Sequence, residues 1–191
     1  MTTQQISDAI KNDANTHKPV MIAIEGFGGS GKSTLASELK TFLADAYVIG
    51  IDDFIIKEKL TDVSPDKIGF DRVRLERQVL IPATSGKSVS FERLEWADNK
   101  LSQPVRVPIT KYLIIEGISS YHPDVAKYFD YKIWVNTLIE VATRRGRLKD
   151  AGNENEQHWD LWAKNDLDYK QKYQPEQRAD FILDNTAEQT T

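Results

Sequence analysis

Residues 26–33 read Gly-Phe-Gly-Gly-Ser-Gly-Lys-Ser and constrain the fold more than any other segment of the chain. They match the pattern G-x-x-x-x-G-K-[ST], in which a glycine-rich loop joins a strand to a helix. An apolar run at residues 20–24 precedes the loop, and residues 33–40 follow it with the composition of a helix. Strand, loop and helix in this order predict a phosphate-binding unit. A glycine-rich turn that binds nothing is the alternative.

The expected chemistry of this loop comes from its backbone. Its N–H groups can point inward at phosphate oxygens, and the N-terminus of the following helix adds a partial positive charge. We expect the ammonium of Lys32 to reach the outer phosphates and the hydroxyl of Ser33 to ligate Mg²⁺. The residues expected around the phosphates are Gly26, Gly28, Gly29, Ser30, Gly31, Lys32, Ser33 and Thr34.

Along the rest of the chain, apolar runs alternate with amphipathic stretches. Short runs that are apolar on both faces are typical of buried parallel strands. The alternation predicts one three-layer α/β domain over residues 1–191, a P-loop NTPase fold whose mostly parallel five-stranded sheet carries helices on both faces. The expected strands are residues 20–24, 47–51, 111–115, 131–135 and 181–183, and the expected helices are residues 4–13, 33–44, 72–80, 138–149 and 155–173.

The middle of the chain, about residues 57–108, is the least regular part and contains several prolines and many charges. We interpret it as a substrate-side insertion with a helix and, as an option, a short hairpin, rather than as a separate domain. Within it, residues 91–96 read Phe-Glu-Arg-Leu-Glu-Trp. This element could contact a substrate or close the insertion on itself, and the sequence leaves both interpretations open.

The overall composition argues against several classes of protein. A net charge of −4 without a basic tail argues against nucleic-acid binding as the main role. No apolar run approaches the ~18 residues of a membrane span, and the N-terminal residues lack the basic and apolar regions of a signal peptide. The absence of cysteine removes disulfides and thiolate chemistry. We therefore expect a cytoplasmic protein that acts on a small molecule, with no nucleic acid and no membrane as partner; a homo-oligomer stays open.

The strand expected at residues 47–51 is followed by Asp52 and Asp53. Ligands of open parallel sheets bind outside the carboxyl ends of the strands, so an acidic residue there can reach them. Successive side chains alternate between faces, and we expect Asp52 to face the phosphate loop. Its predicted role is to orient an acceptor hydroxyl and to take its proton. The alternative is an Asp pair that caps the following turn.

Glu116 follows the strand expected at residues 111–115. Mg²⁺ prefers oxygen ligands and keeps several waters, so one hydroxyl and one or two carboxylates suffice to hold it. We predict a metal site made by Ser33, Asp52 and Glu116. Because many buried strands end in an acidic residue, a structural carboxylate is the alternative.

A basic cluster, Arg-Arg-Gly-Arg-Leu-Lys-Asp, occupies residues 144–150 at the end of a predicted helix. Cations folded over a phosphoryl group stabilise the negative charge that its transfer spreads over the oxygens. The polar stretch that follows suggests a mobile lid over about residues 146–158, from which we expect Arg145 and Arg147 to act. The alternative is a solvated basic face, which also suits a helix C-terminus.

An aromatic set made by Trp159, Trp162, Tyr169 and Tyr173 falls near one face of the last predicted helix. Aromatic residues at helical spacing usually pack in a core. We expect this set to pack against the sheet.

Taken in order, the phosphate loop, the Asp-Asp-Phe element at residues 52–54, the Leu-Ile-Ile-Glu-Gly-Ile element at residues 113–118 and the arginine cluster resemble the uridine kinase and phosphoribulokinase group of P-loop kinases. The segment 174–184, with a Pro and then an Ala-Asp before the last strand, is also similar to that group, as is Leu-Glu-Trp at residues 94–96. The resemblance covers about residues 18–186 and is closest to a bacterial uridine kinase-like branch.

This resemblance implies a kinase that uses ATP and Mg²⁺. It implies that the phosphate loop binds the ATP phosphates, that Asp52 is the catalytic base and that Glu116 assists the metal. The catalytic residues that it implies are Lys32, Asp52, Arg145 and Arg147.

The sequence departs from the family pattern on the acceptor side. Uridine kinases place a Tyr and a His in the middle segment to read the pyrimidine, and no histidine lies between Asp53 and Glu116. Asp62 stands near the expected ribose-binding carboxylate, and Lys149 stands where an Arg usually precedes the lid Asp. ATP use and phosphoryl transfer are therefore implied more strongly than uridine as the acceptor.

The leading hypothesis is an ATP-dependent kinase that phosphorylates a hydroxyl of a small, nucleoside-like molecule, with uridine or cytidine as the default acceptor. A P-loop ATPase or regulatory nucleotide-binding protein that acts on a protein partner is the second hypothesis. A degenerate P-loop protein that binds nucleotide for stability alone is the third. Acceleration of ATP turnover by a small acceptor would distinguish the first hypothesis from the others.

Overall fold

The core is one five-stranded sheet in which the neighbouring strands are parallel. In the computed structural model, which describes residues 1–13 and 19–186, the strand order is β2-β7-β1-β8-β9. Parallel neighbours need crossover connections, and most of these contain helices. The strands are β1 (Val20–Glu25), β2 (Ala46–Gly50), β7 (Tyr112–Glu116), β8 (Tyr131–Asn136) and β9 (Phe181–Asp184).

The strands occupy the predicted segments to within one residue at each end, so the predicted α/β fold is confirmed. The helices are α1 (Thr3–Asp13), α2 (Lys32–Leu43), α3 (Arg72–Leu75), α4 (Ile81–Thr84), α5 (Ile139–Lys149) and α6 (Trp159–Tyr173). A short 3₁₀ turn, Glu156–His158, forms the start of the helix predicted at residues 155–173. None of the helices in the described part of the chain is long and apolar enough to cross a membrane.

The helix predicted at residues 72–80 is longer than expected. A π-helical turn, Glu76–Leu80, joins α3 to α4. The side chain of Asp71 caps the start of α3 by accepting a hydrogen bond from the backbone N–H of Arg74 at 2.9 Å. Pro82 lies in the first turn of α4, where a residue without an N–H is tolerated.

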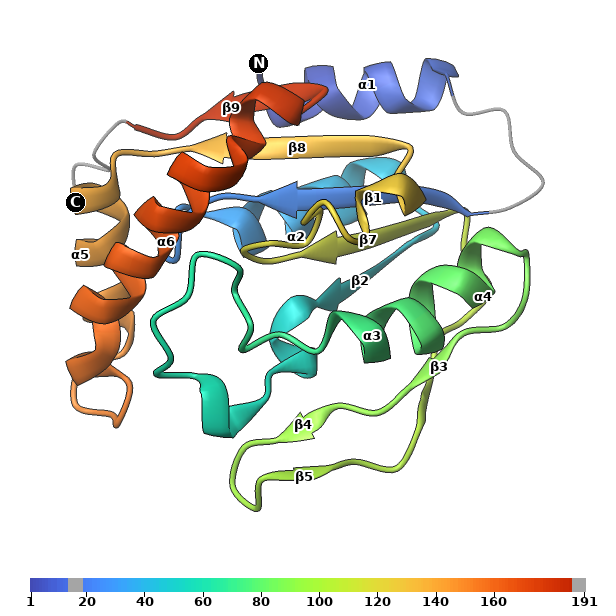
Figure 1. Cartoon of the computed structure of the whole chain (residues 1–191). Coiled ribbons are helices and arrows are strands. Elements are labelled where there is room, and N and C mark those ends of the chain that lie inside the picture. Colours follow the sequence, from blue (N-terminus) through green and yellow to red (C-terminus); the bar gives the residue numbers. More distant parts are fainter. Residues whose placement is uncertain (14–18, 187–191) are drawn as a thin grey trace.

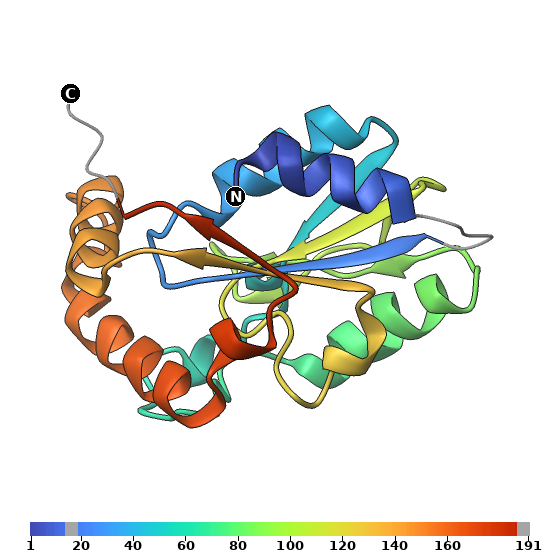
Figure 2. The same ribbon diagram turned by 90° about the horizontal axis from the view of Figure 1, so that it is seen from above.

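Helices cover both faces of the sheet (Figures 1 and 2). On one face, apolar side chains of α1 and α2, such as Ile10 and Leu39, pack with Ile22 of β1. On the other face, Leu75 of α3 and Val79 of the π turn pack with Met21 of β1. The helix α6 lies on this second side as well (Figure 2). The sheet is therefore buried on both faces, as parallel sheets require.

The register brings three strand ends to the same edge of the sheet. Glu116 of β7 lies opposite Ile24 of β1 and opposite Gly50 of β2. The loops that follow these strands therefore start side by side, although they are far apart in the sequence. This edge positions the candidate site.

The predicted insertion contains paired strands as well as the helix. β3 (Ser90–Phe91) pairs with β6 (Val105–Arg106), and β4 (Leu94–Glu95) pairs with β5 (Lys100–Leu101), both antiparallel. Figure 1 shows this ribbon extending away from the sheet. Phe91, however, is fully buried in the core cluster that also holds Ile115 of the central sheet. The insertion thus shares a core with the sheet.

Candidate active site

The glycine-rich loop joins β1 to α2, as predicted, and two of its glycines adopt a left-handed backbone. Gly29 has a φ of 78°, and a Cβ on it would lie 2.1 Å from the carbonyl oxygen of Ala142. Gly31 has a φ of 101° and forms the N-cap of α2. Because residues with a Cβ rarely adopt such angles, this turn requires glycine at both positions.

Lys32 and Ser33 open α2 at the mouth of the loop. The Nζ of Lys32 donates a hydrogen bond to the carbonyl oxygen of Phe27 at 2.8 Å, so the buried side chain folds back across the loop. The Oγ of Ser33 donates to Oε1 of Glu116 at 3.0 Å. The loop and the end of β7 are therefore in direct contact, as the metal-site prediction requires.

The other loop residues shape its walls. A Cβ on Gly26 would lie 2.6 Å from Oγ of Ser30, and the backbone N–H of Ser30 donates to Phe27 at 3.0 Å. Ser30 is buried, and Thr34 is exposed in the first turn of α2. Gly28, Gly29, Lys32 and Ser33 are the loop residues that line the neighbouring cleft.

The two aspartates after β2 diverge, as predicted. Asp52 lines the cleft, whereas Asp53 lies 3.4 Å from Nε of Arg93 in the insertion. The carboxylate of Asp52 is reached by solvent, but protein atoms crowd around it. This desolvation raises the pKa of Asp52, and the charges of Lys32 and Lys149 oppose the rise. A raised pKa suits a carboxylate that accepts a proton.

Glu116 shares this electrostatic environment. Burial raises its pKa, the charge of Lys32 opposes that rise most strongly, and the charge of Asp52 adds to it. The two carboxylates and the lysine therefore act on one another across the same floor of the cleft. Sequence reasoning predicted all three of these residues for the site.

The cleft itself has a volume of about 320 Å³, and five parts of the chain line it, one of which is the end of α5 with the segment that follows it. The phosphate loop and the strand ends form its floor, while the insertion and α6 form its sides. Such a volume is within the range of ligand pockets. Side chains of the insertion and of α6 that line it include Lys59, Asp62, Lys67, Phe70, Trp96, Trp162, Asn165 and Asp166.

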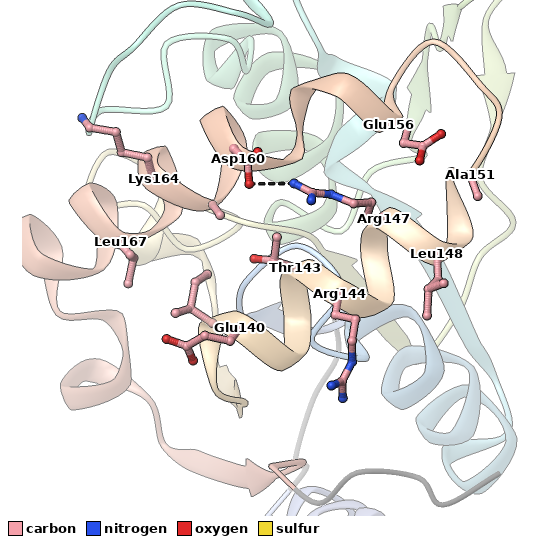
Figure 3. Close-up of a pocket in the computed structure, with 12 residues that line it drawn as sticks. Glu140, Thr143, Arg144, Arg147, Leu148, Ala151, Glu156, Asp160, Lys164 and Leu167 are labelled. Atoms are coloured by element: carbon pink, nitrogen blue, oxygen red, sulfur yellow. Dashed lines mark hydrogen bonds and ion pairs between the residues drawn. The ribbon is translucent and has the colours of Figure 1, made fainter.

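The basic cluster divides between two surfaces. Arg147 pairs with Asp160 of α6 at 2.6 Å and lines a separate groove of about 630 Å³ between α5 and α6, while Arg144 points away from Asp160 (Figure 3). Arg145 donates to the carbonyl oxygen of Asn185 at 3.3 Å. Of the cluster, Lys149 and Asp150 line the cleft. The structure therefore brings Lys149 to the cleft, whereas Arg145 and Arg147, which we expected there, lie outside its lining.

The expected aromatic packing of α6 holds for part of the set. Tyr169 is fully buried, but Trp159, although nearly buried, lines the cleft together with Trp162, and the hydroxyl of Tyr173 donates to Asp66 of the insertion. Trp159 packs so closely that a Cβ on Gly146 would lie 2.0 Å from its ring, and a Cβ on Gly28 would lie 3.0 Å from it. Its Nε1 donates to Asp150 at 3.0 Å. Trp159 thus joins the phosphate loop to the end of α5.

Sequence reasoning missed Asp166 of α6. Its Oδ2 accepts a hydrogen bond from the backbone N–H of Gly28 at 2.8 Å, and its other oxygen contacts Lys67. A signal in the sequence could have found it. Asp166 is a charged residue between Trp162 and Tyr169, on a helix face that was otherwise expected to be apolar.

A second missed residue, Glu25, is the last residue of β1 and is fully buried behind the loop. It accepts hydrogen bonds from the backbone N–H of Tyr121 at 2.7 Å and from the hydroxyl of Tyr169 at 3.1 Å. Desolvation outweighs these bonds and raises the pKa of Glu25 to about 8. Its contact with Tyr169 ties α6 to the base of the loop.

The fold and the phosphate loop together define the structural class of this protein. A phosphate loop after the central strand of a parallel sheet, with helices on both faces, is the three-layer fold of P-loop proteins. A possible uridine kinase from Bacillus stearothermophilus has the same fold, with a TM-score of 0.70 and 18% identity over 95% of this chain and 97% of that one.

The sequence comparison then indicates a particular family. Uridine kinases from Clostridium botulinum and Ureaplasma parvum are 29% and 24% identical to the chain over 147 and 153 residues. These alignments cover 70% and 74% of this chain and 69% and 73% of the relatives. No family model matches the chain. The chain is similar to uridine kinase-like P-loop kinases, which confirms the predicted resemblance and supports a phosphotransferase.

Proposed function

We propose that this protein is a Mg·ATP-dependent kinase that transfers the γ-phosphoryl group to a hydroxyl of a small, nucleoside-like acceptor. The observation that carries the proposal is the meeting of Lys32, Ser33, Asp52 and Glu116 at one edge of the sheet. A phosphate-binding loop and a carboxylate beside it are the two parts that such a transfer needs.

In this proposal the phosphate loop holds the outer phosphates of ATP. The N-terminus of α2 supplies backbone N–H groups and a partial positive charge. Lys32 exchanges its hydrogen bond to the carbonyl oxygen of Phe27 for a hydrogen bond to a phosphate oxygen. The new bond is stronger because both of its partners are charged.

The donor set at the end of β7 fits Mg²⁺. The hydroxyl of Ser33 and the carboxylates of Glu116 and Asp52 are hard oxygen ligands, and Mg²⁺ is usually held by one or two carboxylates together with substrate phosphates. Among the described residues, no group of three or more His, Cys, Asp or Glu side chains could hold a metal by itself. When bound, Mg²⁺ would neutralise charge on the phosphates.

Asp52 is the base in this proposal. Its raised pKa, caused by desolvation, increases its affinity for the proton of the acceptor hydroxyl, and the charges of Lys32 and Lys149 limit the rise. Asp53 is held by Arg93 and takes no part.

We propose that residues 57–108 and about 146–158 act as the acceptor-side insertion and the lid. The insertion contributes Asp62, Phe70 and Trp96 to the cleft, and the lid contributes Lys149 and Asp150. Aromatic faces beside a carboxylate suit a sugar-bearing acceptor. The relatives named uridine kinase support uridine as the first acceptor to test, and cytidine is the second.

The proposal is tested with Mg·ATP and a panel of nucleosides, pantothenate, sugars and sugar phosphates, with ADP release as the readout. We expect one acceptor to accelerate ADP release. On that acceptor, Asp52→Asn should lower turnover by about 10²–10⁴-fold, the usual contribution of a general base, with little change in the Kd for Mg·ATP. Wild-type turnover in Asp52→Asn would refute the base assignment. ADP release that no acceptor accelerates would instead favour a P-loop ATPase.

A further inference from the structure

A buried ion pair crosses the cleft beside the phosphate loop. The ammonium of Lys67, in the insertion, donates to Oδ1 of Asp166 on α6, and the two side chains are only 8% and 6% exposed. The second oxygen of Asp166 accepts the hydrogen bond from the backbone N–H of Gly28 at 2.8 Å. One carboxylate therefore bridges an amide of the phosphate loop and a lysine.

The backbone N–H of Gly28 and the ammonium of Lys67 are also typical hydrogen-bond donors to a phosphoryl group. Phosphate oxygens bind to loop N–H groups at a helix N-terminus and to charged side-chain donors. A carboxylate and a phosphate present their oxygens with similar geometry, so the same donors serve both. Asp166 thus occupies donors that the outermost phosphate of a bound nucleotide could use.

The backbone conformation of Lys67 also supports a role for its side chain in the cleft. Its φ of 50° lies in the left-handed region, which residues with a Cβ seldom adopt. The guanidinium of Arg72 holds the turn by donating to the carbonyl oxygens of Lys67 at 3.0 Å and of Asp66 at 2.8 Å. Unfavourable backbone angles of this kind are retained where the direction of a side chain matters, and here that side chain lines the cleft.

Building on the proposed function, we propose that Lys67 is a second phosphate-binding cation, held by Asp166 until a nucleotide phosphate replaces the carboxylate. On binding, one phosphate oxygen takes the N–H of Gly28 and another takes the ammonium of Lys67. Asp166 then moves away, because its charge repels the phosphate. Lys67 of the insertion is thereby attached to the nucleotide instead of to Asp166, while the hydrogen bonds from Trp162 to Leu60 and from Asn165 to Asp62 still join α6 to the insertion.

A purely structural ion pair makes a different prediction. If Lys67 and Asp166 only stabilise the cleft, removing either charge leaves the other one buried and unpaired, and both variants should lose stability and bind nucleotide less well. In the exchange that we propose, the two substitutions act in opposite directions on affinity. Asp166→Asn removes the competitor and keeps an oxygen for Gly28, whereas Lys67→Met removes the ligand.

The experiment measures the Kd of the magnesium complex of a non-hydrolysable ATP analogue by calorimetry, with thermal unfolding measured in parallel. We expect Asp166→Asn to bind roughly five- to tenfold more tightly than the wild type, and Lys67→Met to bind roughly tenfold or more weakly, the size of one charge-assisted hydrogen bond. The double variant, in which neither charge is left unpaired, should bind as weakly as Lys67→Met. It keeps the test decisive if Lys67→Met does not fold.

The matched control is the ion pair of Lys164 and Asp168, which lies on the same helix at 3.1 Å but is exposed. Lys164→Met and Asp168→Asn should leave the Kd unchanged. A folded Asp166→Asn variant that binds the analogue no better than the wild type would overturn the exchange, while the proposed kinase function would stand. A wild-type protein that does not bind the analogue would overturn both.

Discussion

Glu25 makes the free energy of unfolding depend on pH, and its surroundings explain the direction of this dependence. The side chain is fully buried between β1 and α6, and burial raises its pKa from the ordinary 4.5 to about 8. In the unfolded chain the carboxyl recovers its ordinary pKa, so over the interval between these values the folded state binds the proton and the unfolded state does not. The contribution of Glu25 to stability is therefore complete below the pKa that Glu25 has in the unfolded chain. It is lost as the pH rises through the pKa that Glu25 has in the folded protein.

The magnitude follows from the size of the shift. Each pKa unit is worth about 1.36 kcal/mol, so the free energy of unfolding should fall by up to about 1.4 kcal/mol per pH unit between roughly pH 5 and pH 8. The loss across the whole interval is on the order of 5 kcal/mol. Glu25→Gln carries no ionisable group there and should lack this dependence. Its amide oxygen can still accept the N–H of Tyr121.

Urea unfolding of the wild type and Glu25→Gln at a series of pH values measures the effect. The variant should be close to the wild type near pH 5 and more stable than the wild type above about pH 8, because an ionised Glu25 is costly to bury. Glu140→Gln, at an exposed position of α5, is the control and should keep the wild-type slope. A stability difference between wild type and Glu25→Gln that stays constant across the series would refute this explanation.

Two further predictions concern the loop and the lid. Gly29→Ala would place a Cβ 2.1 Å from the carbonyl oxygen of Ala142 at a φ of 78°, so the loop must shift, and calorimetry should detect little or no binding of Mg·ATP. Lys149→Met should reduce turnover on the identified acceptor by about tenfold or more, and by more than Arg147→Met does, because Lys149 lines the cleft and Arg147 pairs with Asp160 outside it. Equal losses in the two variants would instead support the lid arginine that the sequence suggested.

The fold could be predicted because its signals are local. Each core strand is a short apolar run, and β1 is buried along its whole length, so the pattern appears directly in the sequence. The helix at residues 72–80 was too short in the prediction. Its π turn and its continuation past Pro82 depend on packing against the sheet, which local propensity does not report.

The candidate site was predictable where the residues lie next to strand ends. Glu116 ends β7, Asp52 comes two residues after β2, and Lys32 and Ser33 begin the helix after the β1 loop; parallel strands bring such positions to one edge. The lid was harder to predict, because residues of one short helical segment point in different directions. Only Leu148 separates Arg147 from Lys149 in the sequence, yet Arg147 lines the groove between α5 and α6 and Lys149 lines the cleft.

By itself, then, the amino-acid sequence determined the phosphate loop, because its glycines, lysine and serine are contiguous and their backbone requirements are local. Only the tertiary structure decided which distant groups reach that loop. Asp166 is 138 positions from Gly28 along the chain and 99 positions from Lys67. Such contacts depend on how α6 and the insertion pack against the sheet, and packing arises from the whole chain rather than from any one segment.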